Sequence, residues 1–174
     1  MRVDTSYVSQ ENFWSKMSRL KYDICYYDFY FAHCVFISRI LTAITVGGTS
    51  IATLLWMEWN GIPAFAKVCP YVILGLQVMS VFKEHFPHDG RKKELRELLD
   101  ELLPIYENME ADWQMIALGH YTEQEVIGKA TTYAQEIEKI RKHYFKEDAL
   151  PVKPKLIERA DAEVKQYYAN KGWC

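Results

Sequence analysis

Histidine, cysteine, serine and carboxylate side chains carry most protein chemistry, and this chain spaces few of them as a catalytic site requires. His33 and Cys34 are adjacent, so on a helix they point in different directions and do not pair as nucleophile and base. His85 and His88 form an HxxH in the turn-like segment HFPHDG, but a zinc site needs more than two ligands. The motifs GxxxxGK(S/T), GxGxxG, GxSxG and HExxH are absent. We therefore expect no enzyme, no bound metal and no cofactor.

A second set of polar side chains is spaced for packing or transport rather than for catalysis. Its members recur every three or four residues, which places them on one face of a helix. They are Ser38, Thr42, Thr45, Thr49 and Thr53, with Gln77 in the next apolar run. In lipid, such a face packs against another helix through its hydroxyl groups, or it lines water in a pore. Both readings stay open, and a pore would require several copies because two spans enclose no channel.

Two apolar runs position this face. Residues 40–57 contain no charged residue, and as a helix they rise about 27 Å, close to the hydrocarbon thickness of a bilayer. Residues 62–82 form a weaker run because Lys67 and Pro70 interrupt it. Basic residues flank the pair but not the short turn between the runs, which favours two membrane spans with both termini cytoplasmic. The alternative is a pair of buried helices in a soluble bundle.

Aromatic and basic side chains gather where these runs would meet the bilayer surface. The stretch KYDICYYDFYFAHC holds four tyrosines just ahead of the first run. Tyrosine and tryptophan favour the headgroup layer, so we expect a membrane-interface collar here. Its members are Tyr22, Tyr26, Tyr30, Arg39, Trp56 and Trp59. A tyrosine-lined ligand site is the alternative interpretation.

The rest of the chain is patterned as amphipathic helices. Apolar residues alternate in steps of four and three along three segments, which predicts an antiparallel stalk in which the N-terminal helix packs on a helical hairpin. The predicted packing residues are Phe13, Met17, Ile24, Tyr27, Leu95, Leu99, Leu102, Tyr106, Trp113, Tyr133, Ile137 and Ile140. Thr122 and Glu125 match a capping box at the start of the last of these helices. The first helix is expected to run unbroken from about residue 10 to 57.

These elements predict an all-α chain, namely a two-span transmembrane helical hairpin with a cytoplasmic antiparallel coiled-coil or three-helix stalk. The expected parts are an N-terminal cytoplasmic helix continuous with the first span (1–39), the transmembrane hairpin (40–82), a cytoplasmic helical hairpin (83–150), and a linker with a short helix (151–174). The net charge of −2 gives no electrostatic case for nucleic acid. The expected partners are the lipid bilayer, further copies of the chain, and a regulatory or sensor protein.

This layout, with SRLKYDICYYDFYFAHC ahead of the first span, resembles the SLATT families of small two-span bacterial membrane proteins. The resemblance covers about residues 10–150 and rests on length, span placement and the aromatic and basic residues before the first span. It implies an oligomeric effector that permeabilises or disrupts the bacterial inner membrane during anti-phage defence. The alternatives are a membrane-anchored scaffold that recruits a cytoplasmic partner through its stalk, and a soluble all-helical interaction protein.

Overall fold

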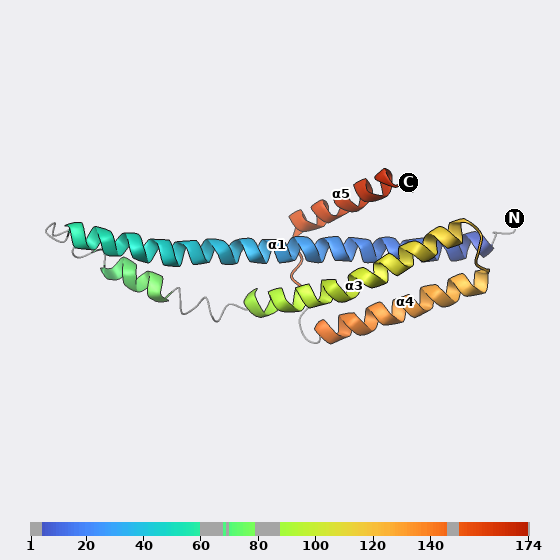
Figure 1. The fold of residues 1–174 in the computed structure, drawn as a ribbon, viewed down its shortest axis with the longest axis horizontal. Coiled ribbons are helices and arrows are strands. Elements are labelled where there is room, and N and C mark those ends of the chain that lie inside the picture. The colour runs from blue at the N-terminus through green and yellow to red at the C-terminus, as the bar shows by residue number, and fades with distance from the viewer. Residues whose placement is uncertain (1–4, 60–67, 69, 79–87, 146–149, 174) are drawn as a thin grey trace. The chain divides into compact units, whose positions relative to one another are not determined.

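The computed structural model describes residues 5–59, 68, 70–78, 88–145 and 150–173, and all regular structure among them is helical. The helices are α1 (Thr5–Trp59), α3 (His88–Ala117), α4 (Glu123–Tyr144) and α5 (Pro154–Asn170), and residues 70–78 are also helical. Figure 1 shows the order of these elements along the chain. The predicted all-α class is confirmed.

Helix α1 is 55 residues long and unbroken. No proline occurs between residues 5 and 59, so nothing in this stretch removes a backbone donor or blocks the preceding turn. Gly47 and Gly48 lie inside the helix, where each costs about 1 kcal/mol relative to alanine. Packing gives a reason for a residue without a side chain at Gly48, where Leu76 lies close, but not at Gly47.

The chain forms two compact units. The first, called here the helical unit, comprises Met1–Phe31 and Glu94–Cys174, and so contains the N-terminal half of α1, nearly all of α3, and α4 and α5. The second, called here the apolar unit, comprises Ala32–Lys93, with the C-terminal half of α1 and residues 70–78. Helix α1 therefore belongs to both units.

Helices α3 and α4 form an antiparallel hairpin within the helical unit (Figure 1). Gly119 turns the chain at φ 76°, a left-handed conformation that costs glycine nothing because it has no Cβ. Its N–H donates to the Ile116 carbonyl at 2.9 Å and so satisfies one of the free acceptors at the end of α3. The predicted capping box at the start of α4 is confirmed, because Thr122 and Glu125 each accept a hydrogen bond from the other's backbone N–H.

The core of the helical unit draws on all four helices. Its largest fully buried side chains are Phe13, Met17 and Leu20 on α1, with Leu98, Leu102 and Met109 on α3. Helix α4 adds Val126, Ala130 and Ile137, and α5 adds Ala160 and Tyr168. The Phe13 ring stacks on Trp113 of α3 and meets Tyr133 of α4 edge-on, with ring centroids 6.3 Å apart in both pairs. One aromatic side chain of α1 thus joins both helices of the hairpin.

Candidate functional site

The apolar unit leaves much of its hydrophobic surface exposed. The exposed large side chains include Phe36, Ile40, Ile44, Val46 and Leu54 on α1, and Val68, Tyr71, Val72, Leu74 and Val78 beyond it. Among the described residues, one helical stretch, Tyr7–Gly48 of α1, is long and apolar enough to cross a membrane. Only 17% of its most apolar 18-residue window is buried, whereas the core helix of a soluble bundle is mostly buried. This surface therefore needs lipid or protein to cover it.

The predicted polar face of α1 bonds to its own helix. Thr42 Oγ1 donates to the Ser38 carbonyl at 2.8 Å, and Thr45 Oγ1 donates to the Leu41 carbonyl at 2.9 Å. These bonds satisfy the hydroxyl protons within the helix, which lowers the cost of placing the face in an apolar medium.

The members of this face differ in exposure. Thr45 is buried, Ser38 is half-buried, and Thr42, Thr53 and Gln77 are exposed. The side chain of Thr49 lies outside the described residues. The structure therefore presents the face partly as packing surface and partly as open polar surface.

Gly48 lies against the second apolar segment. A Cβ added at Gly48 would stand 3.0 Å from Leu76 Cδ1 and 3.4 Å from Leu76 Cδ2, which is closer than ordinary van der Waals contact. A Cβ added at the neighbouring Gly47 would meet no atom within 4 Å. Within the apolar unit, α1 and residues 70–78 thus approach closely at Gly48, and the two glycines are not equivalent.

Two of the predicted collar tyrosines occupy a different environment from the expected headgroup layer. Tyr26 and Tyr30 are buried in the helical unit. The Tyr26 hydroxyl donates to the Pro151 carbonyl at 3.0 Å and accepts from the Lys153 N–H at 3.3 Å. The Lys153 ammonium lies 5.2 Å from the centroid of the Tyr30 ring. These tyrosines hold the segment that leads into α5, a contact that no local pattern in the sequence indicates.

The other predicted collar residues are more dispersed. Tyr22 is half-buried, and Arg39 is exposed on the apolar part of α1. The side chains of Trp56 and Trp59 lie outside the described residues. For these four residues, a place at the membrane interface stays a prediction.

Most of the predicted stalk residues line the core of the helical unit. Phe13, Met17, Ile24, Leu95, Leu102, Tyr106 and Ile137 are buried, whereas Tyr27, Leu99, Trp113, Tyr133 and Ile140 are half-buried. Leu98 and Ile105 are buried but were not predicted. They follow the same four-three spacing as the predicted stripe, and the adjacent leucines at 98 and 99 leave its register ambiguous.

A polar cluster that the sequence did not indicate joins α3 to α4. The Lys129 ammonium donates to both carboxylate oxygens of Asp112 at 2.8 and 3.0 Å. The hydroxyls of Tyr133 and Tyr121 donate to the same carboxylate at 2.7 and 3.1 Å. Partial burial raises the pKa of Asp112, but the three donors outweigh it, so the pKa lies below its usual value. The ionised carboxylate is therefore the form that stabilises the hairpin.

Two further carboxylates join other helix pairs. Glu110 of α3 accepts from the Tyr167 hydroxyl of α5 at 2.7 Å and pairs with Lys171. Asp23 of α1 pairs with Arg141 of α4. Burial raises the pKa of Asp23, and the guanidinium opposes that rise. With Asp112, these pairs connect α1, α3, α4 and α5 by contacts that depend on ionised groups.

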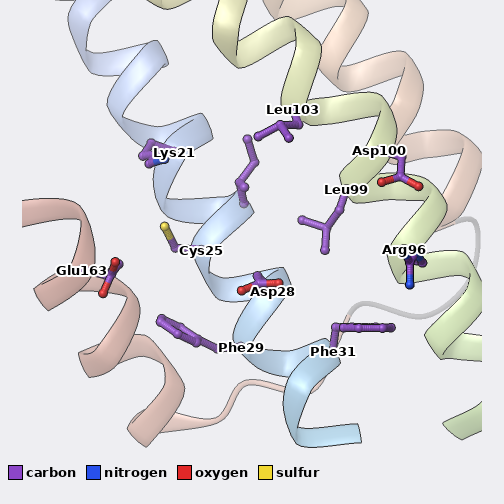
Figure 2. Close-up of a pocket in the computed structure, with 11 residues that line it drawn as sticks. Lys21, Cys25, Asp28, Phe29, Phe31, Arg96, Leu99, Asp100, Leu103 and Glu163 are labelled. Atoms are coloured by element: carbon purple, nitrogen blue, oxygen red, sulfur yellow. The ribbon is translucent and has the colours of Figure 1, made fainter. Parts of the chain in front are cut away.

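A pocket of about 520 Å³ lies in the helical unit beside α1. Figure 2 shows Glu163 of α5 on one side and Arg96 and Asp100 of α3 on the other. Its apolar lining is Ile24, Phe29, Phe31, Leu99 and Leu103. Charges of both signs around apolar side chains suit packing against an amphipathic molecule, but they do not form a catalytic arrangement.

The cysteine in this pocket is not poised as a nucleophile. Burial raises the pKa of the Cys25 thiol, so the thiol stays protonated near neutral pH, and the thiolate is the reactive form. Among the described residues, no group of three or more histidine, cysteine or carboxylate side chains is placed to hold a metal ion. His85 lies outside the described residues, as does the side chain of His88.

Comparisons with models of protein families, with curated proteins and with solved structures found no match for this chain.

Proposed function

We propose that the chain is an oligomeric membrane protein whose apolar unit inserts into a bilayer as a two-span hairpin and permeabilises it. The observation that carries the proposal is the low burial of the most apolar part of α1, at 17% of an 18-residue window. Burying one large aliphatic side chain gains about 1.5–3 kcal/mol relative to leaving it in water. The exposed side chains of the apolar unit therefore favour a bilayer or an oligomer strongly over water.

The polar face supports assembly within that membrane. Thr42 and Thr45 satisfy their hydroxyl protons locally, so the face enters lipid at low cost. Hydroxyl-bearing helix faces of this kind pack closely against other helices in a membrane. Two spans cannot enclose a channel, so permeabilisation requires several copies whose polar faces meet. In this proposal the helical unit is the cytoplasmic stalk, and both termini are cytoplasmic.

The biological setting is proposed from the resemblance of the layout to the SLATT families. A bacterial inner-membrane effector that acts in anti-phage defence must be held inactive until a signal or a partner triggers it. In this proposal the helical unit, in which four helices pack around one core, is the part that such a partner contacts.

Inducible expression in a bacterium, followed with a dye that reports membrane potential, tests the proposal. We expect the chain to fractionate with membranes and to collapse the potential. Changing Thr42, Thr45 and Thr49 together to leucine should keep membrane residence and abolish the collapse. An unchanged collapse in this variant would refute the polar-face mechanism, and recovery of the wild-type chain in the soluble fraction would refute membrane insertion.

A membrane-anchored scaffold is the second candidate function. It is favoured by the helical unit, whose core and polar pairs lie within Met1–Phe31 and Glu94–Cys174. A scaffold needs its spans only as an anchor. Replacing residues 40–82 by an unrelated two-span hairpin would then preserve function, whereas the same replacement abolishes a permeabilising activity.

A further inference from the structure

Three tryptophans from separate parts of the chain meet in the helical unit. Trp14 lies on α1, Trp113 lies on α3, and Trp173 follows α5. The ring centroid of Trp14 is 5.0 Å from that of Trp113 and 6.1 Å from that of Trp173. All three side chains are half-buried rather than enclosed. A cluster of large rings that retains access to solvent differs from an ordinary aromatic core.

The position of Trp173 is fixed by the turn that ends α5. Gly172 adopts φ 67°, which glycine tolerates, and the Trp173 N–H donates to the Tyr168 carbonyl at 3.0 Å. This turn returns the ring to the bundle, where it stacks beside Tyr168 and meets Trp14. The third tryptophan is therefore held by backbone geometry.

The three rings border a pocket of about 380 Å³. The remaining lining residues are Tyr7, Gln10, Glu11 and Ala117. Glu11 is the single charged residue of this lining, and it is exposed. The pocket of Figure 2 differs, because lysine and arginine line it together with its acids. Aromatic faces and one carboxylate thus line the tryptophan pocket, and the lining itself includes no lysine or arginine.

Such a lining selects organic cations, because the ring faces attract positive charge and a carboxylate adds to that attraction. The chain itself already places a cation on one of these rings, since the Lys171 ammonium lies 5.0 Å from the Trp173 centroid. A primary ammonium carries three N–H donors that need acceptors when water is removed. A methylated ammonium has no such need, so a mostly apolar aromatic pocket suits it better.

We propose that the pocket formed by Trp14, Trp113, Trp173, Tyr7 and Glu11 binds a trimethylammonium group. The volume lies within the range of small-molecule sites. The group occurs both in free choline and in the headgroup of phosphatidylcholine. This site is independent of membrane permeabilisation, so a failure of either proposal leaves the other intact.

The test titrates the full-length chain in a detergent without a choline headgroup, following tryptophan fluorescence. The probes are choline and its neutral isostere 3,3-dimethyl-1-butanol, which has the same shape without the charge. We expect choline to bind roughly tenfold more tightly, a ratio typical of a partly desolvated cation–π site. Equal binding of the two probes, or no binding of choline, overturns the proposal.

Two matched pairs of variants separate a site from a general charge effect. Glu11→Gln should weaken choline binding several-fold, whereas Glu107→Gln, which changes an exposed carboxylate outside the pocket, should leave it unchanged. Trp173→Leu should abolish the preference for choline over its isostere, and Trp173→Phe should retain part of it because an aromatic face remains. Equal effects of Glu11→Gln and Glu107→Gln would contradict the proposal, and circular dichroism verifies that each variant is folded.

A last arm identifies the source of the cation. The chain is placed in vesicles of phosphatidylglycerol, with or without phosphatidylcholine, and free choline is titrated. A higher choline midpoint in the presence of phosphatidylcholine means that lipid headgroups compete for the pocket. An unchanged midpoint means that the pocket takes the free cation, and absence of choline binding in both vesicle types overturns the site.

Discussion

The two glycines of α1 allow a sharp test of the apolar unit. Gly48→Leu places side-chain atoms where a Cβ alone would already stand 3.0 Å from Leu76 Cδ1, whereas Gly47→Leu enters a space with no atom within 4 Å of its Cβ. Both substitutions change helix propensity by the same amount, so propensity cancels between them. Overpacking costs about 1–3 kcal/mol. We expect Gly48→Leu to be less stable than Gly47→Leu by that amount.

Thermal unfolding in detergent, followed by circular dichroism, measures the difference. For a unit of this size 1 kcal/mol corresponds to about 4–8 °C in Tm, so a separation of several degrees is expected. In cells, Gly48→Leu should also reduce the collapse of membrane potential, because the hairpin can no longer close at this point. Equal Tm values for the two variants, or a lower Tm for Gly47→Leu, would refute the close approach of α1 to residues 70–78.

Three further predictions concern the polar contacts. Asp112→Asn weakens its charge-assisted hydrogen bonds and should lower the free energy of unfolding by about 1–3 kcal/mol in denaturant titrations, and an unchanged midpoint would contradict the cluster. The pKa values of Asp112 and Glu110 lie below their usual values, because hydrogen bonds outweigh partial burial. The two ionised carboxylates therefore contribute their full stabilisation at pH values above about 4, the pKa of such groups in the unfolded chain, and this contribution is lost as the pH falls through their lower pKa values in the folded chain. The Tm, measured from pH 7 to pH 3, should therefore fall in acid. The fall should be smaller in Asp112→Asn, which lacks one of the two carboxylates. Tyr26→Phe removes the hydrogen bond to the Pro151 carbonyl and should lower the free energy of unfolding by about 0.5–1.5 kcal/mol. Amide hydrogen exchange should become faster in α5 than in the other helices of the variant. An equal change in exchange rate across all helices would contradict this prediction.

Much of the fold can be predicted from the sequence, because the course of each helix depends on residues that are close together in the chain. A long stretch without proline predicts one unbroken α1, and the spacing of Thr122 and Glu125 predicts the start of α4. The register of α3 is less determined, since Leu98 and Leu99 both fit a helical stripe and only the packed partner selects Leu98.

The contacts that the sequence did not indicate all join residues distant along the chain. Tyr26 bonds to Pro151, 125 positions away, and nothing near Tyr26 indicates that partner. The Asp112 cluster draws its donors from 9 to 21 positions further on, across a turn. The tryptophan pocket needs three separate segments to meet. Periodicity identifies which face of a helix is apolar, but it carries no information about which distant segment covers that face.

The attachment of α5 has a consequence for assembled copies. Only Ala160 and Tyr168 of this helix are buried, so its docking contact is small compared with that of α1 or α3. Covalent attachment keeps such a helix at a high effective concentration near its docking contact, so a small contact suffices within one chain. In the proposed oligomer each neighbouring copy carries the same α1 and α3 side chains, Trp14 and Glu110, that α5 contacts in its own chain. Exchange of α5 between copies of that oligomer would preserve these contacts and join the copies to one another through them.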